Sequence, residues 1–86
     1  MTPEARNELR REALRWLASR PACAHSLKMV TNGLKREGLD APDAEVVAAL
    51  AFLCGDKLVE TVVDPLGSVK TYKVTSDGIR YDERNP

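Results

Sequence analysis

The sequence contains few of the residues that build disulfide frameworks and metal sites. Its 86 residues include two cysteines, Cys23 and Cys54, and a single histidine. A disulfide-built scaffold of this length usually has four or more cysteines, and a structural zinc site needs four ligands. We therefore expect no metal, no cofactor and no disulfide framework. Both cysteines stand among apolar residues, which predicts two reduced thiols in the core.

Signatures of catalysis are missing as well. The single histidine, His25, stands next to Ser26, but adjacency alone does not make a nucleophile and its base. We expect His25 at the edge of the core or in a short strand, and Ser26 as the cap of a helix. The five glycines are scattered and form no phosphate-binding loop. The sequence predicts a protein that is not an enzyme and has no small-molecule substrate.

The chain has no excess of positive charge. Thirteen Lys and Arg residues balance thirteen Asp and Glu residues. A nucleic-acid-binding protein more often has a clear basic excess, although a local basic patch is enough to attract phosphates. No apolar run approaches the length of a membrane span, and the charged N-terminal segment does not have the pattern of a signal peptide. We expect a cytoplasmic protein without membrane contact.

Apolar residues recur at helical spacing in three segments of the first 55 residues. This pattern predicts helices at about 3–19, 26–37 and 42–55. Thr2 and Ser26 have the side chains of N-caps, and Gly38 follows the second segment where a left-handed glycine commonly ends a helix. Pro42 suits the first position of the third helix.

The period changes to two after residue 55. Residues 58–63 and 69–74 are rich in β-branched and apolar side chains, and the turn-forming residues 64–68 separate them. We predict a β-hairpin at about 58–74, followed by a short C-terminal turn at about 76–82. A short third strand near Ala24 and His25 is a further possibility. These elements predict one domain over residues 1–86, mainly α with small β.

Two local motifs resemble the winged helix-turn-helix family. The first is Ala51-Phe52-Leu53 followed by Asp56-Lys57-Leu58-Val59, and the second is Tyr72-Lys73-Val74-Thr75-Ser76-Asp77-Gly78. The resemblance implies a three-helix winged helix-turn-helix with a two-stranded wing, and it implies nucleic-acid binding or transcription regulation. A narrower resemblance to small stand-alone winged-helix proteins of Mu-like prophages implies a bacterial or phage origin. Lys57 stands where the family usually has glycine, so we expect this helix to end without a left-handed residue.

In the family, the third helix usually lies in the DNA major groove. Here no Arg, Lys, Asn or Gln occurs between Pro42 and Asp56, so we expect no base readout by this segment. The remaining candidates for contacts with the phosphates of duplex DNA are the cations Lys28, Lys35, Arg36, Lys70 and Lys73. The alternative is that these five residues only keep the protein soluble.

The outward face of the third helix has a second interpretation. Projection at 100° per residue places small and apolar side chains opposite the core side, and these are Ala44, Val47, Ala48, Ala51 and Phe52. Exposed apolar strips often mark interaction sites, unless the wing or the tail of the same chain covers Phe52. Two functions therefore stay open. One is a nucleic-acid-binding or regulatory module, and the other is a protein-interaction or homodimerisation module that keeps the scaffold without base readout.

Overall fold

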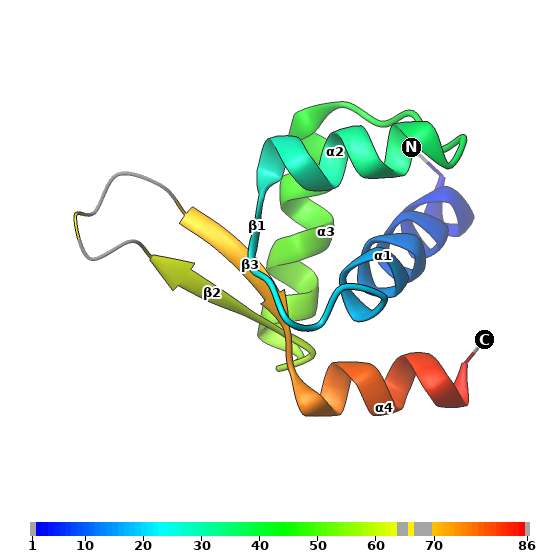
Figure 1. The fold of residues 1–86 in the computed structure, drawn as a ribbon. Helices are drawn as coiled ribbons and strands as arrows, with labels where there is room; N and C mark the ends of the chain where they lie inside the picture. Colours follow the sequence, from blue (N-terminus) through cyan, green and yellow to red (C-terminus); the bar gives the residue numbers. More distant parts are fainter. Residues whose placement is uncertain (1, 64–65, 67–69, 86) are drawn as a thin grey trace.

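The computed structural model describes residues 2–63, 66 and 70–85. Within these residues the chain forms helices α1 (Pro3–Ala18), α2 (Leu27–Arg36), α3 (Asp43–Gly55) and α4 (Ser76–Arg84), and strands β1 (His25–Ser26), β2 (Val59–Val63) and β3 (Lys70–Val74). Figure 1 shows α1, α2 and α3 packed around one centre, with the β2–β3 hairpin extending away from them and α4 lying below α1.

The sheet is antiparallel and has the strand order β1–β3–β2. His25 of β1 is opposite Tyr72 of β3, and Val59 of β2 is opposite Val74. Tyr72, Val74, Val59 and His25 are all buried, so one face of the sheet closes the core between the helices. The expectation that His25 lies at the core edge or in a short strand is confirmed.

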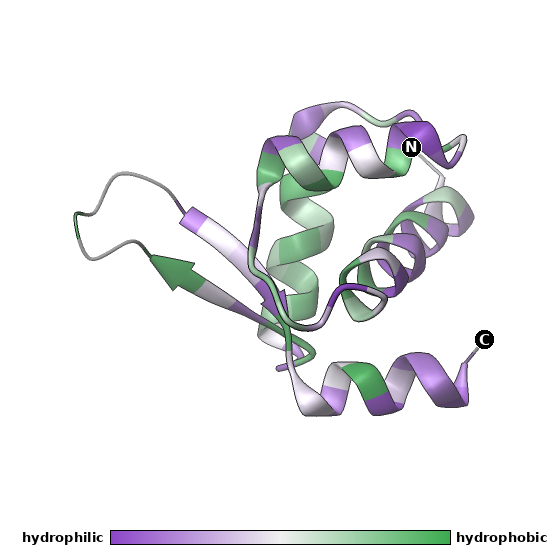
Figure 2. Cartoon of the chain, in the orientation of Figure 1, coloured by the Kyte–Doolittle hydropathy of each residue, from purple (hydrophilic) through white to green (hydrophobic). Residues whose placement is uncertain are grey.

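Leucines from all three N-terminal helices fill the core. Leu9, Leu14 and Leu17 of α1 are buried with Leu34 of α2 and Leu50 of α3. Figure 2 shows that α1 alternates between hydrophobic and hydrophilic residues, whereas α3 is hydrophobic along most of its length. An amphipathic helix buries one stripe, but a helix that is apolar all round has apolar side chains left over for its outer face.

Side-chain caps set the starts of three helices. The Thr2 hydroxyl accepts from the backbone N–H of Ala5 at 3.1 Å, and the Ser26 hydroxyl accepts from that of Met29 at 3.4 Å. Thr75 caps α4 by accepting from Gly78 N–H at 3.0 Å, while its hydroxyl donates to the Lys57 carbonyl at 2.8 Å. One threonine therefore holds the end of α3 and the start of α4 together.

The end of α3 corrects one expectation. Lys57 has φ of 63°, so this lysine itself adopts the left-handed conformation that glycine commonly supplies at a helix end. The N–H of Lys57 donates to the Cys54 carbonyl, and the N–H of Leu58 donates to the Leu53 carbonyl, each at 3.0 Å. These bonds satisfy the last carbonyls of α3 and offset part of the strain of a non-glycine residue there.

Other boundaries differ from those predicted from the sequence. The bounds of α1, α2 and α3 differ by one residue at most, with Pro42 serving as the N-cap of α3 and not as its first residue. The C-terminal segment is longer than a turn, because α4 has nine residues. The third strand begins at His25. Of the predicted turn 64–68, only Leu66 lies within the described residues, and Val69 lies outside them.

The prediction that both cysteines lie in the core is wrong for Cys23. Cys23 is exposed in the connection after α1, and Cys54 is half-buried against the core. Both are free thiols. Cys23 follows Pro21 in a segment where the chain turns at the surface, so the apolar composition of its neighbours there does not indicate burial.

Candidate nucleic-acid interface

The outer face of α3 is open to solvent. Ala44, Val47, Ala48, Ala51 and Phe52 are all exposed, whereas Val46, Ala49, Leu50 and Leu53 of the same helix are buried. The five residues form the outer strip of α3. The exposed fractions of Val47 and Phe52 are 41% and 43%, so the strip presents hydrocarbon and no hydrogen-bond donors.

One edge of the outer strip meets α1. The Arg10 guanidinium lies over the Phe52 ring, 3.6 Å from its centroid. A groove of about 340 Å³ runs beside Phe52, and its lining includes Arg11 of α1 and Tyr81 of α4. The stacked arginine covers part of the Phe52 ring and places a positive charge at this edge.

The opposite edge of the outer strip, beside Val47, has a cation near each end. Lys28 Nζ of α2 lies 3.7 Å from Asp43 Oδ2 at the start of α3. Burial raises the pKa of the Cys54 thiol near the end of α3, and the positive charge of nearby Lys70 opposes this shift. Asp43 and Cys54 are eleven positions apart, which puts them on the same side of the helix, about 16 Å apart along its axis. Lys28 and Lys70 are therefore the two edge cations.

Of the other three candidate cations, only Lys35 lies on the same side as one of the edge cations. Lys35 is seven positions from Lys28 on α2, so the two share a helix face. Arg36 lines a different cavity, together with Trp16 of α1. Lys73 lies one position out of phase with Tyr72, on the other face of the sheet, with Glu60 directly opposite. The structure therefore does not bring all five predicted cations into one patch.

The position of Lys70 follows from the register of the hairpin. Lys70, Tyr72 and Val74 alternate on the face of β3 that points to the helices, and the Lys70 ammonium lies 5.7 Å from the Tyr72 ring centroid. This cation–π contact is near the outer limit of the usual distance, so the attraction between the ring and the ammonium is weak. Tyr72 is the last buried residue on this side of β3, so Lys70 lies on the same face but is exposed. Cys54 of α3 and Thr61 of β2 line one pocket and Thr61 is opposite Tyr72, so this face of β3 passes the end of α3.

Within residues 2–63, 66 and 70–85, no three or more His, Cys, Asp or Glu side chains gather where they could hold a metal ion. None of the helices described there is long and apolar enough to cross a membrane.

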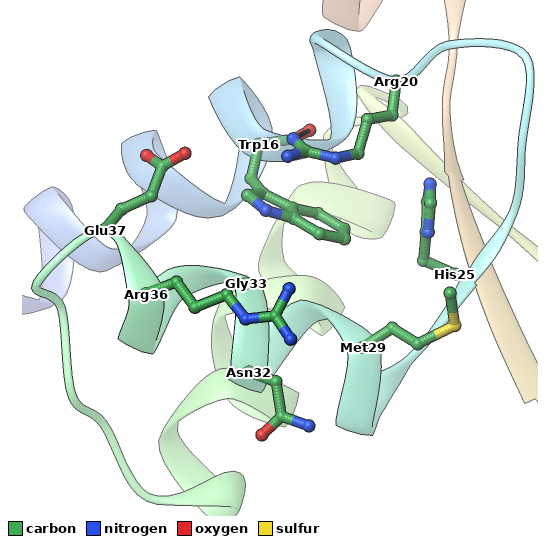
Figure 3. A pocket seen from close by; sticks show the side chains of 8 residues that line it. All are labelled: Trp16, Arg20, His25, Met29, Asn32, Gly33, Arg36 and Glu37. Carbon is green, nitrogen blue, oxygen red and sulfur yellow. Dashed lines mark hydrogen bonds between the residues drawn. The ribbon is translucent and has the colours of Figure 1, made fainter.

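Sequence reasoning missed a cavity of about 400 Å³ between α1, β1 and α2. Its lining includes Trp16, Arg20, His25, Met29 and Arg36, which Figure 3 shows around one opening. One feature of the sequence indicated part of this cavity. Trp16 and Arg20 are spaced at i and i+4, which places an arginine over an indole at a helix end. Only the pairing of β1 with β3 brings His25 to them.

Comparisons with known proteins identify the fold. No family model matches the sequence, and no curated protein matches it. The chain is similar to a solved PadR-like transcription factor from Bacteroides fragilis, with 21% identity and a TM-score of 0.73 over 92% of this chain and 77% of that one. It is also similar to a mutant MepR from a multidrug-resistant S. aureus clinical isolate, with 19% identity and a TM-score of 0.73 over 98% of this chain and 64% of that one.

A mutant of ZitR from Lactococcus lactis is a third similar structure, with 15% identity and a TM-score of 0.65 over 85% of this chain. The chain spans about half the length of ZitR, since the match covers 47% of it. At these identities the similarity shows the fold. The predicted class, a mainly helical winged helix with a small β-sheet, is confirmed.

Proposed function

We propose that this chain is a non-enzymatic regulatory module that binds duplex DNA through backbone phosphates, without base readout by α3. The observation that carries the proposal is the pair of edge cations on one side of the exposed face of α3, Lys28 beside Asp43 and Lys70 on the face of β3 that passes the end of α3. The similar solved structures include a protein described as a transcription factor, which supports the same conclusion. The proposal includes the bacterial or phage origin that the narrower resemblance to winged-helix proteins of Mu-like prophages implies.

The chemistry of the outer strip determines what kind of binding is expected. Methyl groups of Ala44, Ala48 and Ala51 can approach a groove closely but cannot distinguish bases by hydrogen bonding. Phosphate contacts position a protein on DNA and carry no sequence information directly. Binding should therefore be weak, tolerant of sequence and strongly dependent on salt.

The double substitution Lys28→Gln and Lys70→Gln tests the proposal. Each cation that neutralises a phosphate contributes about 0.9 to the slope of log K against log salt, so the double variant should reduce this slope by about 1.8. Fluorescence anisotropy with a labelled random duplex, titrated at several salt concentrations, measures it. The control is Arg6→Gln with Arg84→Gln, which removes the same charge from exposed positions on α1 and α4. Equal slopes for the two double variants, or no binding by the wild type at low salt, would refute the proposal.

A second candidate function rests on the exposure of Val47 and Phe52. Apolar side chains exposed at about two fifths of their area, on a helix with small neighbours, suit contact with another protein or a second copy of the chain. In that case the outer strip would be covered in the assembly, and α3 would not contact DNA.

Ala48→Arg separates the two candidates. Ala48 is exposed in the middle of the outer strip, so the substitution should not disturb the core. If α3 faces DNA, the added cation should steepen the salt slope by about 1 and raise the affinity. If the strip is an interface, the buried charge should abolish a complex that the wild type forms, which analytical ultracentrifugation detects. Weaker DNA binding together with loss of a dimer would favour the interaction module.

A further inference from the structure

The cavity between α1, β1 and α2 contains a buried histidine whose ring nitrogens have no hydrogen-bond partner among the described residues. His25 is 7% exposed, and neither Nδ1 nor Nε2 has a hydrogen-bond partner in the described part of the chain. An imidazole ring has at least one N–H donor in every protonation state, and buried polar groups are rarely left unbonded. The ring therefore lacks an acceptor that something outside the chain can supply.

The position of His25 is determined by its neighbours. Its ring packs edge to face against the Trp16 indole, with 4.8 Å between centroids and an interplanar angle of 71°. In Figure 3 the Met29 side chain extends toward His25 from α2. Met29 is 51% exposed and unbranched, so a ligand can displace it and reach the imidazole.

Two guanidinium groups lie on either side of Trp16 in the same opening (Figure 3). Arg20 lies over the indole, 4.2 Å from the ring centroid, and its NH1 group donates to the Trp16 carbonyl at 3.1 Å and to the Ser19 hydroxyl at 2.7 Å. These two bonds orient the Arg20 side chain. The N–H donors on its other two nitrogens stay available to a ligand. Arg36 is exposed and makes no ion pair with any described residue.

Glu37, the acidic residue that lines the cavity, lies away from His25 and the two guanidinium groups. Glu37 is placed in Figure 3 at the end of the opening opposite His25. The part of the cavity between His25, Arg20 and Arg36 is therefore positive, and it suits a negatively charged oxygen group.

The rest of the cavity is suited to hydrocarbon. Arg20 covers one region of the indole, and the backbone of Gly33 packs so closely on Trp16 that an added Cβ would clash with the ring. Arg20 and Gly33 therefore restrict the indole surface that a ligand can contact, and the Met29 side chain lines the same cavity. A volume of about 400 Å³ exceeds the needs of an inorganic anion and lies within the range of small-molecule sites.

We propose that this cavity binds a small organic acid. Its carboxylate accepts hydrogen bonds from His25, Arg20 and Arg36, and its compact apolar body lies against Trp16 and displaces Met29. This site is separate from the proposed DNA contacts of Lys28 and Lys70, and its occupancy is measured on the protein without DNA, so the two proposals fail independently.

Trp16 is the only tryptophan and reports on the site directly. Cyclohexanecarboxylate is the probe, and its neutral amide and inorganic phosphate are the comparisons. We expect saturable changes in Trp16 fluorescence and in the indole N–H resonance with the carboxylate, and binding about tenfold weaker or worse with the amide and with phosphate. Equal binding of amide and carboxylate, equal binding of phosphate, or no saturable change at millimolar probe would overturn the proposal.

Variants assign the contacts. Arg36→Gln should weaken cyclohexanecarboxylate binding about tenfold, whereas Lys35→Gln, which removes the neighbouring exposed cation of α2, should leave it unchanged. His25→Phe keeps a ring against Trp16 and removes the donor, and it should weaken binding by a similar factor. If that variant does not fold, Arg20→Gln replaces it as the second test. Equal effects of Arg36→Gln and Lys35→Gln would show attraction by net charge alone and would overturn the assignment.

Discussion

Leu50→Ala is expected to lower the free energy of unfolding by about 3 kcal/mol, because truncating a fully buried leucine loses apolar burial and leaves a cavity. Leu50 is 0% exposed at the centre of α3. Val47→Ala on the same helix is the matched control. Its side chain is 41% exposed, and we expect a change within about 0.5 kcal/mol. Urea unfolding followed by circular dichroism measures both.

This pair of variants tests more than the core. The proposed DNA contacts and the alternative protein interface both require the side of α3 that contains Val47 to face solvent. A cost for Val47→Ala comparable to that for Leu50→Ala would mean that both sides of α3 are covered, and neither function could then use the outer strip.

Gly78→Ala is expected to destabilise the fold by about 2 kcal/mol. Gly78 is buried in the first turn of α4, and a Cβ there would collide with the backbone carbonyl oxygen of Leu58. A backbone atom cannot move aside as the end of a flexible side chain can. The clash outweighs the roughly 1 kcal/mol that alanine gains over glycine in a helix.

Gly55→Ala is the control for this prediction. Gly55 ends α3, and a Cβ built on it meets no atom within 4 Å among the described residues outside its own helix turn. The same substitution should leave the stability unchanged or raise it by less than about 1 kcal/mol. Thermal or urea unfolding of both variants decides the matter. If Gly78→Ala were as stable as Gly55→Ala, α4 would not dock on Leu58 as described.

The α4 helix explains why the C-terminal prediction was too short. A glycine three residues after Thr75 indicates a turn when only local propensity is considered. In the structure the same glycine lets the helix approach Leu58, and Thr75 supplies its cap. Arg15 of α1 adds an ion pair to Asp82 of α4 at 3.7 Å. These contacts join residues far apart in the sequence, so no local pattern reveals them.

The candidate site was predictable in part. The spacing of apolar residues assigned Val46, Leu50 and Leu53 to the core and Ala44, Ala48 and Ala51 to the outer face, and the structure has this arrangement. The grouping of cations was not predictable. Lys70 and Lys73 are close in sequence, but the alternation of β3 sends them to opposite faces, and Lys73 meets Glu60 through the hairpin register.

Local physics in the sequence determined α1, α2 and α3, the caps at Thr2 and Ser26 and the inward side of α3, because these depend on contacts within about four residues and on the period of apolar side chains. Tertiary structure alone decided that Lys28 and Lys70 share one edge of α3, that α4 docks at Gly78, and that β1 carries His25 to Trp16. Each of these depends on how closely two distant backbones approach, and that distance is set by the packing of the whole core.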